Sequence, residues 1–228
     1  MNKFIITQLC SIGLAIVLCM FTPPIVSYLF LILLSIRVFM FLKPTKGKRI
    51  PELQSPQKAL VVIDLQESMC GSSGTYPQKE DFVERVNKII FAAKQNNEKV
   101  IYICQEFQRF DCIFCFLAFG GRLLHGTKSA CLCSNLEMTG DSIFIKHQQD
   151  AFTSKQFVEY LQTNQINELS IVGLDASACV CKTATGAINR GYTVSLIQDG
   201  IIGKHVNITN RTLKKLSKRG IAIISPSY

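Results

Sequence analysis

The stretch SIVGLDASACV, residues 170–180, is the part of the sequence that decides the fold. It begins with an apolar run that is typical of a buried parallel strand, and it ends where a helix over residues 180–190 is predicted to start. A strand, a tight bend and a helix N-terminus would place Cys179 where backbone N–H groups point outward, a field that favours thiolate over thiol. Cys179 is therefore a candidate nucleophile. The chain has ten cysteines, and most cysteines are small buried side chains, so an unreactive Cys179 is the alternative at this point.

Apolar strand patterns alternate with helical patterns through the chain after its N-terminal segment. The predicted strands cover residues 59–63, 99–104, 142–145, 169–174, 192–197 and 221–224, and the predicted helices cover residues 79–95, 154–165, 180–190 and 207–219. This alternation predicts an α/β fold of three layers, α/β/α, with a six-stranded parallel sheet between helices. Asp64, Lys146 and Cys179 each lie at or just beyond the carboxyl end of a predicted strand, which is where active residues gather in such sheets.

Three separated pieces of sequence resemble the isochorismatase-like cysteine hydrolases. They are ALVVIDLQ at 59–66, IFIK at 143–146 with the downstream Ala151 and Phe152, and GLD at 173–175 with Cys179 and Val180. The pieces are similar to the family's first strand with its catalytic Asp, to its strand-end Lys and to its cysteine motif, in the same order. The resemblance covers residues from about Lys58 to Ile224. It implies the strand order 3-2-1-4-5-6 and makes Cys179 the expected nucleophile.

The resemblance also implies a role for each residue of a catalytic triad. Cys179 would attack the substrate carbonyl, Asp64 would take the thiol proton and pass it to the leaving nitrogen, and Lys146 would hold Asp64 and favour the thiolate. The backbone N–H groups of Asp175 and Cys179 would stabilise the oxyanion, and the peptide bond between Leu174 and Asp175 would be cis. From the helix N-terminus and Lys146 together we expect a lowered pKa for Cys179. The negative charge of Asp64 works in the other direction, so the two groups are expected to titrate together.

Some isochorismatases that cleave vinyl ethers lack the cysteine, so its presence favours a C–N hydrolase acting on a small amide, carbamoyl or ureido compound. Family members commonly assemble as dimers or tetramers, and a homo-oligomer is expected here. The alternative from another class is a membrane-tethered, non-catalytic binding or scaffold protein of the same fold, which the intact Asp64, Lys146 and Cys179 disfavour. The loops expected to face the substrate, residues 67–77 and 105–127, match no pattern that names one.

We expect no cofactor and no metal ion at this site. Metal-dependent members of the family carry Asp-x-His after the second strand, whereas residues 105–108 of this chain read QEFQ. His125 and His147 have no partners at the spacing that metal ligands require. Four cysteines leave a zinc site open as a weaker alternative, namely Cys112, Cys115, Cys131 and Cys133. The aromatic residues of the same stretch indicate a satellite of the core, with a pocket wall or a subunit contact as alternatives.

The N-terminal segment is apolar. Residues 4–21 and 25–42 form two apolar runs, separated by Pro23 and Pro24. Their lengths and the break between them predict a transmembrane helical hairpin. A signal peptide is disfavoured because no small-x-small cleavage site precedes a mature start. The predicted organisation is a membrane anchor at residues 1–43, a linker at 44–57 and the hydrolase domain at 58–228.

The net charge of +9 suggests nucleic acid or an anionic membrane surface as a partner. Four basic residues between 43 and 49 follow the second apolar run and predict a membrane protein whose domain lies on the cytoplasmic side. Arg37, near the end of that run, is expected to reach the membrane interface. A second basic cluster, in residues 204–219, is typical of a solvated helix face. No RNA-binding signature is present, so the lipid bilayer is the expected partner and nucleic acid is not.

Overall fold

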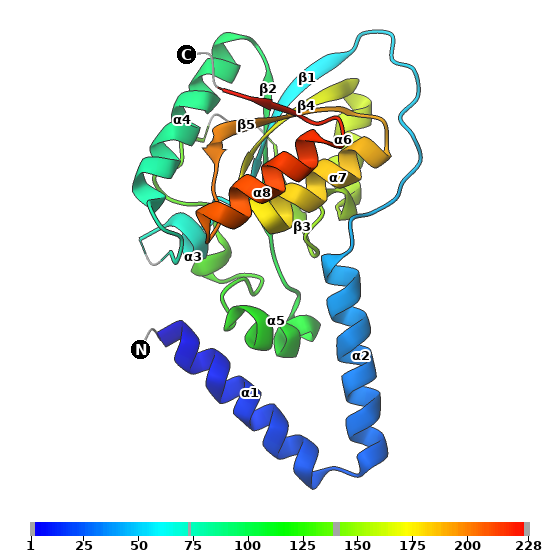
Figure 1. The fold of residues 1–228 in the computed structure, drawn as a ribbon, viewed down its shortest axis with the longest axis vertical. Coiled ribbons are helices and arrows are strands. Elements are labelled where there is room, and N and C mark those ends of the chain that lie inside the picture. The colour runs from blue at the N-terminus through cyan, green and yellow to red at the C-terminus, as the bar shows by residue number, and fades with distance from the viewer. Residues whose placement is uncertain (1–2, 73, 139–141, 226–228) are drawn as a thin grey trace.

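The computed structural model describes residues 3–72, 74–138 and 142–225. Its centre is a six-stranded parallel sheet in the order β3-β2-β1-β4-β5-β6, which confirms the predicted order (Figure 1). The strands are β1 (Gln57–Ile63), β2 (Lys99–Gln105), β3 (Ile143–Lys146), β4 (Ile166–Gly173), β5 (Thr193–Ile201) and β6 (Ala222–Ile224). Parallel strands run in one direction, so all their carboxyl ends meet at the same edge of the sheet.

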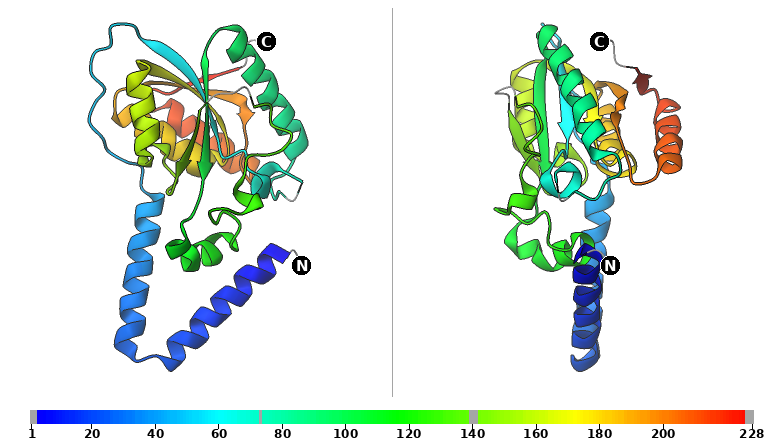
Figure 2. Two further views of the ribbon diagram at one scale, coloured as in Figure 1. Left: turned by 180° about the vertical axis from the view of Figure 1, so that it is seen from behind. Right: turned by 90° about the vertical axis from the view of Figure 1, so that its left-hand side faces the viewer.

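Helices cover both faces of the sheet, which confirms the three-layer prediction (Figure 2). They are α4 (Lys79–Gln95) on one face and α6 (Lys155–Thr163), α7 (Cys181–Asn189) and α8 (Val206–Ser217) on the other. The short helices α3 (Glu67–Cys70) and α5 (Cys112–Phe119) lie in the segments that follow β1 and β2, at the carboxyl edge of the sheet. Along β1, Leu60 and Val62 pack with α4 on one face, while Val61 and Ile63 pack with α6, α7 and α8 on the other. A strand buried on both faces has to be apolar at every position, and this is why the central strand was readable from sequence.

The structure differs from the predicted elements in three places. α3 and α5 lie in stretches that were expected to be loops, because helices of four and eight residues are too short to show a clear period. β5 continues to Ile201 instead of residue 197, since it resumes pairing with β4 after a shift of register. The helix after the nucleophile divides into a π-helical turn, Ala176–Val180, and α7.

The segment predicted as a linker forms no helix or strand from residue 44 to 56, and it is hydrogen-bonded to the domain. The backbone N–H and the hydroxyl of Thr45 both donate to Asp150 Oδ2 at 2.7 Å, and the N–H of Ile50 donates to the carbonyl of Arg190 at 2.9 Å. Asp150 is fully buried, and burial raises the pKa of its carboxyl group. These bonds fix how the N-terminal helices are held relative to the sheet.

Two long apolar helices precede this segment and diverge from each other in a V (Figure 1). They are α1 (Lys3–Phe21) and α2 (Pro24–Leu42), and the chain turns between them at Thr22 and Pro23. α2 is long and apolar enough to cross a membrane, and α1 holds a shorter apolar stretch, Ile6–Leu18. Large apolar side chains along both helices are exposed in the structure.

The last turns of α2 are bound to the domain, so Arg37 does not have the position that the sequence suggested. Its guanidinium forms two hydrogen bonds of 2.9 Å to the carboxylate of Asp111, directly before α5, and lies 4.8 Å from the ring centroid of Phe114. Phe41, one turn later, is buried against Phe107. The aromatic residues after β2 therefore form a satellite core that holds α2, in agreement with the favoured interpretation of that stretch.

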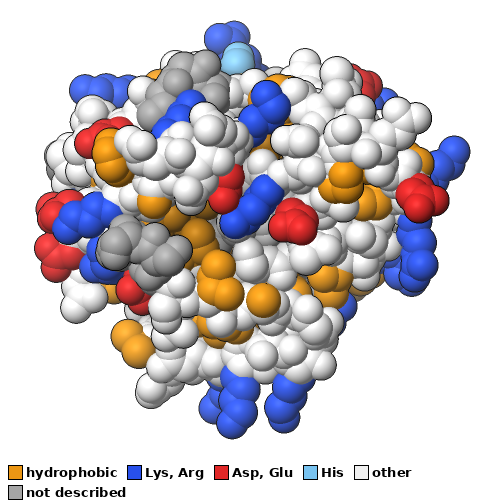
Figure 3. Space-filling model, turned by 90° about the horizontal axis from the view of Figure 1, so that it is seen from above, with side chains coloured by type: hydrophobic (Ala, Val, Ile, Leu, Met, Phe, Trp, Pro, Cys, Tyr) orange, Lys and Arg blue, Asp and Glu red, His pale blue; other side chains and the backbone are white. Residues whose placement is uncertain are grey.

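Charge on the opposite end of the molecule is dispersed. Seen from the side away from the hairpin, basic side chains lie around the rim of the surface with acidic ones among them (Figure 3). The basic residues of α8 follow the expected pattern of a solvated helix face, because Leu213 and Leu216 are buried while Lys214 and Lys215 are exposed.

Gly173, the last residue of β4, is a position where the fold requires glycine. Its φ is +130°, and a Cβ atom there would lie 2.2 Å from the carbonyl oxygen of Ile63. We expect Gly173→Ala to lower the free energy of unfolding by about 3 kcal/mol or more, because backbone strain and a clash with main chain add. Gly126→Ala is the matched control: φ is +78° and no atom lies within 4 Å, so only the strain of about 1–2 kcal/mol remains. If thermal unfolding showed that the two variants lose the same free energy of unfolding, this explanation would be contradicted.

Candidate active site

The three residues predicted as a triad come together at the carboxyl edge of the sheet. Asp64 directly follows β1, Lys146 is the last residue of β3, and Cys179 lies in the turn after β4. The ammonium of Lys146 donates to Asp64 Oδ2 at 2.9 Å and to Cys179 Sγ at 3.3 Å. Asp64 has a left-handed backbone conformation, φ +57°, which is unusual for a residue with a side chain and aims its carboxylate back over the sheet edge.

Lys146 is the electrostatic centre of this group. Its side chain is fully buried, and its third hydrogen bond goes to Gln105 Oε1 at 2.9 Å, so all three ammonium donors are used. Burial alone would lower the pKa of Lys146, but the negative charge of Asp64 and the interaction with Cys179 raise it above its ordinary value. The lysine is therefore held in its charged form between the carboxylate and the sulfur.

Cys179 does not have the environment that the sequence predicted. It is the fourth residue of the turn Ala176–Val180 and not the first residue of a helix. Burial first, and then the negative charge of Asp64, raise the pKa of the Cys179 thiol, and Lys146 offsets only part of this rise. The expectation of a lowered pKa is wrong because the same ammonium is already paired with the carboxylate beside the sulfur. The resting site holds a thiol, a carboxylate and an ammonium.

Two glutamines that sequence reasoning did not assign a role support the triad. Gln66 donates to the carbonyl groups of Gln105 and Ala130 at 3.0 and 2.5 Å and accepts from the N–H of Gln105 at 2.9 Å. Gln105 in turn receives the hydrogen bond from Lys146. The pattern Asp-x-Gln at 64–66 was the sequence signal for Gln66. A polar side chain two residues after Asp64 lies at the same part of the sheet edge as the carboxylate.

Asp175 organises the turn that carries the nucleophile. Its carboxylate accepts from the N–H of Ser177 at 2.7 Å, from the N–H of Lys204 at 3.1 Å and from the hydroxyl of Tyr76 at 3.2 Å. The peptide bond between Leu174 and Asp175 is cis, which is the geometry that the resemblance implied. Among the described residues, no acceptor takes the backbone N–H of Asp175. This N–H group is therefore available to a ligand, as an oxyanion donor has to be.

A cavity of about 280 Å³ opens beside this turn. It is lined by the turn itself, by Tyr76, by the loop at residues 203–205 and by Phe119 at the end of α5. Cys179 is partly exposed, while Asp64 and Lys146 are buried behind it. Asp175, Ser177 and Ala178 of the turn that carries Cys179 line this cavity, so a small molecule in it would lie beside that turn.

The residues considered as metal ligands do not form a metal site in the described part of the chain. His125 Nδ1 lies 2.5 Å from Glu106 Oε2, and His147 Nδ1 lies 2.8 Å from the Glu106 carbonyl oxygen. No group of three His, Cys, Asp or Glu side chains that could hold an ion occurs among the described residues. The four cysteines of the alternative zinc site are likewise separated, since Cys133 contacts Cys70 and Cys112 lines a different cavity.

The raised pKa of Cys179 predicts how its alkylation depends on pH. Only the thiolate reacts with iodoacetamide, so below the pKa the rate rises about tenfold per pH unit. Between pH 7 and 9.5 we expect Cys179 to react with this slope and without a plateau. Free cysteine in the same sample is the reference thiol, and its rate should level off near the ordinary thiol pKa of about 8.5. Mass spectrometry measures both rates, and a plateau for Cys179 below pH 8 would restore the low-pKa hypothesis.

The fold and the arranged residues define a class: a three-layer α/β/α domain with a parallel sheet that carries a cysteine, an aspartate and a lysine at its carboxyl edge. The sequence model of the isochorismatase domain matches residues 58–226. The chain therefore belongs to the isochorismatase family.

Individual relatives are distant. The chain is 23% identical over 180 residues to the secreted isochorismatase effector Isc1 of Phytophthora sojae, which covers 78% of this chain and 77% of that protein. Two solved structures share the fold. Pyrazinamidase of Pyrococcus horikoshii in complex with zinc has a TM-score of 0.65 and 23% identity, over 75% of this chain and 100% of that one. N-carbamoylsarcosine amidase from Thermoplasma acidophilum has a TM-score of 0.63 and 20% identity, over 74% of this chain and 96% of that one.

Proposed function

We propose that this protein is a cysteine hydrolase that cleaves a C–N bond in an amide, carbamoyl or ureido compound. The observation that carries the proposal is the ammonium of Lys146, which is hydrogen-bonded to both Asp64 and Cys179 in a buried site. Two structural relatives named as amidases, pyrazinamidase and N-carbamoylsarcosine amidase, support the C–N bond as the target. A partly exposed thiol in contact with a buried carboxylate and a buried ammonium is what acyl transfer to a thiol requires.

The proton has a defined route in this arrangement. Asp64 Oδ1 is buried and accepts no hydrogen bond from the described residues, so it is free to take the proton of Cys179 when the sulfur attacks. The S–C bond forms, the oxyanion receives the N–H of Asp175, and Asp64 returns the proton to the leaving nitrogen as the C–N bond breaks. A water molecule then attacks the thioester and gives one proton to Asp64. Asp64 passes that proton to the sulfur of Cys179 as the S–C bond breaks, which restores the thiol. Throughout, the ammonium of Lys146 stays hydrogen-bonded to Asp64 Oδ2 and holds the carboxyl group in place.

Ammonia release from a panel of amides, carbamoyl and ureido compounds tests this proposal on the full chain. Turnover of at least one compound is expected, and it should persist in a chelator because no step uses a metal ion. Loss of activity in EDTA that zinc or iron restores would overturn the metal-free mechanism. If no compound is turned over and Cys179→Ala binds partners unchanged, the non-catalytic scaffold is the better description.

We also propose that α1 and α2 anchor the protein in a membrane with the domain on the cytoplasmic side. The exposed apolar side chains of both helices and the exposed basic residues Lys46, Lys48 and Arg49 next to α2 support this. A reporter after Arg49 should behave as cytoplasmic, and one inserted between Pro23 and Pro24 should be external if the hairpin spans the bilayer. An external signal after Arg49 would reverse the orientation. A homo-oligomer and the absence of nucleic acid among the partners remain predictions.

A further inference from the structure

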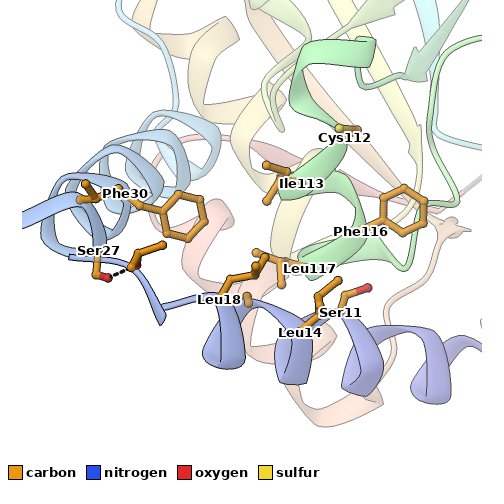
Figure 4. A pocket seen from close by; sticks show the side chains of 12 residues that line it. Ser11, Leu14, Leu18, Ser27, Phe30, Cys112, Ile113, Phe116 and Leu117 are labelled. Atoms are coloured by element: carbon orange, nitrogen blue, oxygen red, sulfur yellow. Dashed lines mark hydrogen bonds between the residues drawn. The ribbon is translucent and has the colours of Figure 1, made fainter. Parts of the chain in front are cut away.

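An apolar cavity of about 490 Å³ lies between α1, α2 and α5, within the range of about 300–1,000 Å³ that is usual for small-molecule sites. Leu14 and Leu18 of α1, Phe30 of α2 and Ile113 and Phe116 of α5 line it (Figure 4). The few hydroxyl groups in its wall already have partners. Ser11 donates to the carbonyl of Thr7 at 2.8 Å, and Thr22 and Ser27 are hydrogen-bonded to each other at 2.7 Å. The cavity therefore suits a hydrocarbon chain and offers little to a polar ligand.

α2, one wall of this cavity, is bound at its far end to the edge of the sheet that carries the triad. The carbonyl of Phe41, at the end of α2, accepts from Gln149 after β3, and the Arg37 guanidinium reaches the carbonyl of His147, next to the catalytic lysine. α5 is a wall of both cavities: Phe116 lines the apolar one, and Phe119, about one turn later, lines the one beside the Asp175 turn. The active site thus faces the N-terminal helices and not the charged opposite end of the molecule.

We propose that the apolar cavity binds the acyl chain of a membrane-borne amide, so that the substrate class of the hydrolase is a long-chain fatty amide that reaches Cys179 from the bilayer. This rests on the proposed C–N hydrolase function. The occupant is a lipid chain because the outer surfaces of α1 and α2 are themselves apolar and exposed, which makes the cavity continuous with the hydrocarbon that would surround them. Ile113, on α5, is also exposed, so the apolar surface extends from the hairpin onto the domain.

Turnover against chain length tests the inference. The full chain in phosphatidylcholine nanodiscs is supplied with saturated primary amides from acetamide to palmitamide, and ammonia release is measured. Referred to the amide concentration in the bilayer, which removes the effect of partitioning from water, kcat/KM should rise with chain length until the cavity is filled and then level off. Ala15→Trp, which fills the cavity from α1, should remove most of this gain, whereas Phe91→Trp, on the exposed face of α4, should not. No gain with length, or the same gain in Ala15→Trp, would overturn the inference and leave the proposed hydrolase intact.

Binding can be read without activity because the chain contains no tryptophan. In Phe116→Trp, a brominated fatty amide in an unbrominated bilayer should quench the indole fluorescence, and in Phe91→Trp it should not. If no amide of any length releases ammonia, the proposed function fails, and quenching alone then decides whether the cavity binds an acyl chain. Equal quenching of the two tryptophans would show lipid contact without a site.

Discussion

Replacing Cys179 by alanine is expected to abolish amide turnover and to leave the fold intact. The sulfur is the attacking atom in the proposed reaction, and alanine occupies much of the same small space in the turn. We expect ammonia release to fall on the order of 10⁴-fold or more, while the midpoint of thermal unfolding changes by a few degrees at most. Substrate binding, measured by calorimetry on the full chain, should persist because the cavity beside the turn is lined by other residues.

The losses from the three residues should not add. Asp64→Asn removes the proton acceptor, and Lys146→Met removes the ammonium that holds Asp64 and Cys179 together, so either change stops the same step that Cys179→Ala stops. Combining any two should therefore give little further loss, as is usual for residues that act as a unit. Independent contributions that multiply in the double variants would argue against a shared proton route.

Cys181→Ala is the control for the nucleophile. Cys181 is the first residue of α7, two residues after Cys179, and it packs against the apolar core. The variant should keep nearly full turnover with a modest loss of stability. If Cys181→Ala kills activity and Cys179→Ala does not, the assignment of the nucleophile is wrong.

The sequence was sufficient for those parts of the fold in which one physical requirement acts on every residue. A strand buried on both faces must be apolar throughout, and residues 59–63 show this without interruption. Parallel strands place their carboxyl ends at one edge, so Asp64, Lys146 and Cys179 could be expected together from their positions alone. The order of the strands needed the family resemblance, because periodicity does not say which strands are neighbours.

Contacts between segments far apart in the chain could not be predicted in the same way. Arg37 looked like a lone charge in an apolar run, and its partner Asp111 follows it by 74 residues. α5 reads as one more apolar stretch, and only its contacts show that it is the wall between the hairpin and the active site. Thr45 and Asp150 are similar: nothing near Thr45 in sequence indicates that residues 44–56 are bound to the domain.

The pKa of Cys179 was predicted with the wrong sign for a related reason. A helix N-terminus and a nearby lysine both favour a thiolate, and the opposing charge of Asp64 was expected from the sequence. The larger effect is burial of the thiol, whose extent a sequence does not contain. The site consequently holds one proton on sulfur and one net positive charge on Lys146, balanced by Asp64. Such a balance makes the stability of the domain depend on the ion pair between Lys146 and Asp64.

Lys146→Met is expected to destabilise the protein as well as inactivate it. Lys146 is fully buried and Asp64 is 2% exposed, so removing the ammonium leaves a buried carboxylate without a cation, and its Oδ1 accepts no hydrogen bond from the described residues to compensate. Breaking one side of a buried ion pair costs about 3–5 kcal/mol. For a chain of this size that corresponds to a fall of roughly 6–20 °C in the midpoint of thermal unfolding, measurable by differential scanning fluorimetry on the full chain in detergent.

Adding Asp64→Asn to Lys146→Met separates charge from structure. The double variant has no unpaired ion, and the two side chains keep nearly their original volumes. Its unfolding midpoint should therefore recover a large part of what Lys146→Met loses, while its turnover stays at the level of the single variants. A midpoint that falls by the sum of the two single effects would mean that Asp64 and Lys146 stabilise the fold through separate contacts. In that case the 2.9 Å ion pair would not be the element that couples the carboxyl ends of β1 and β3.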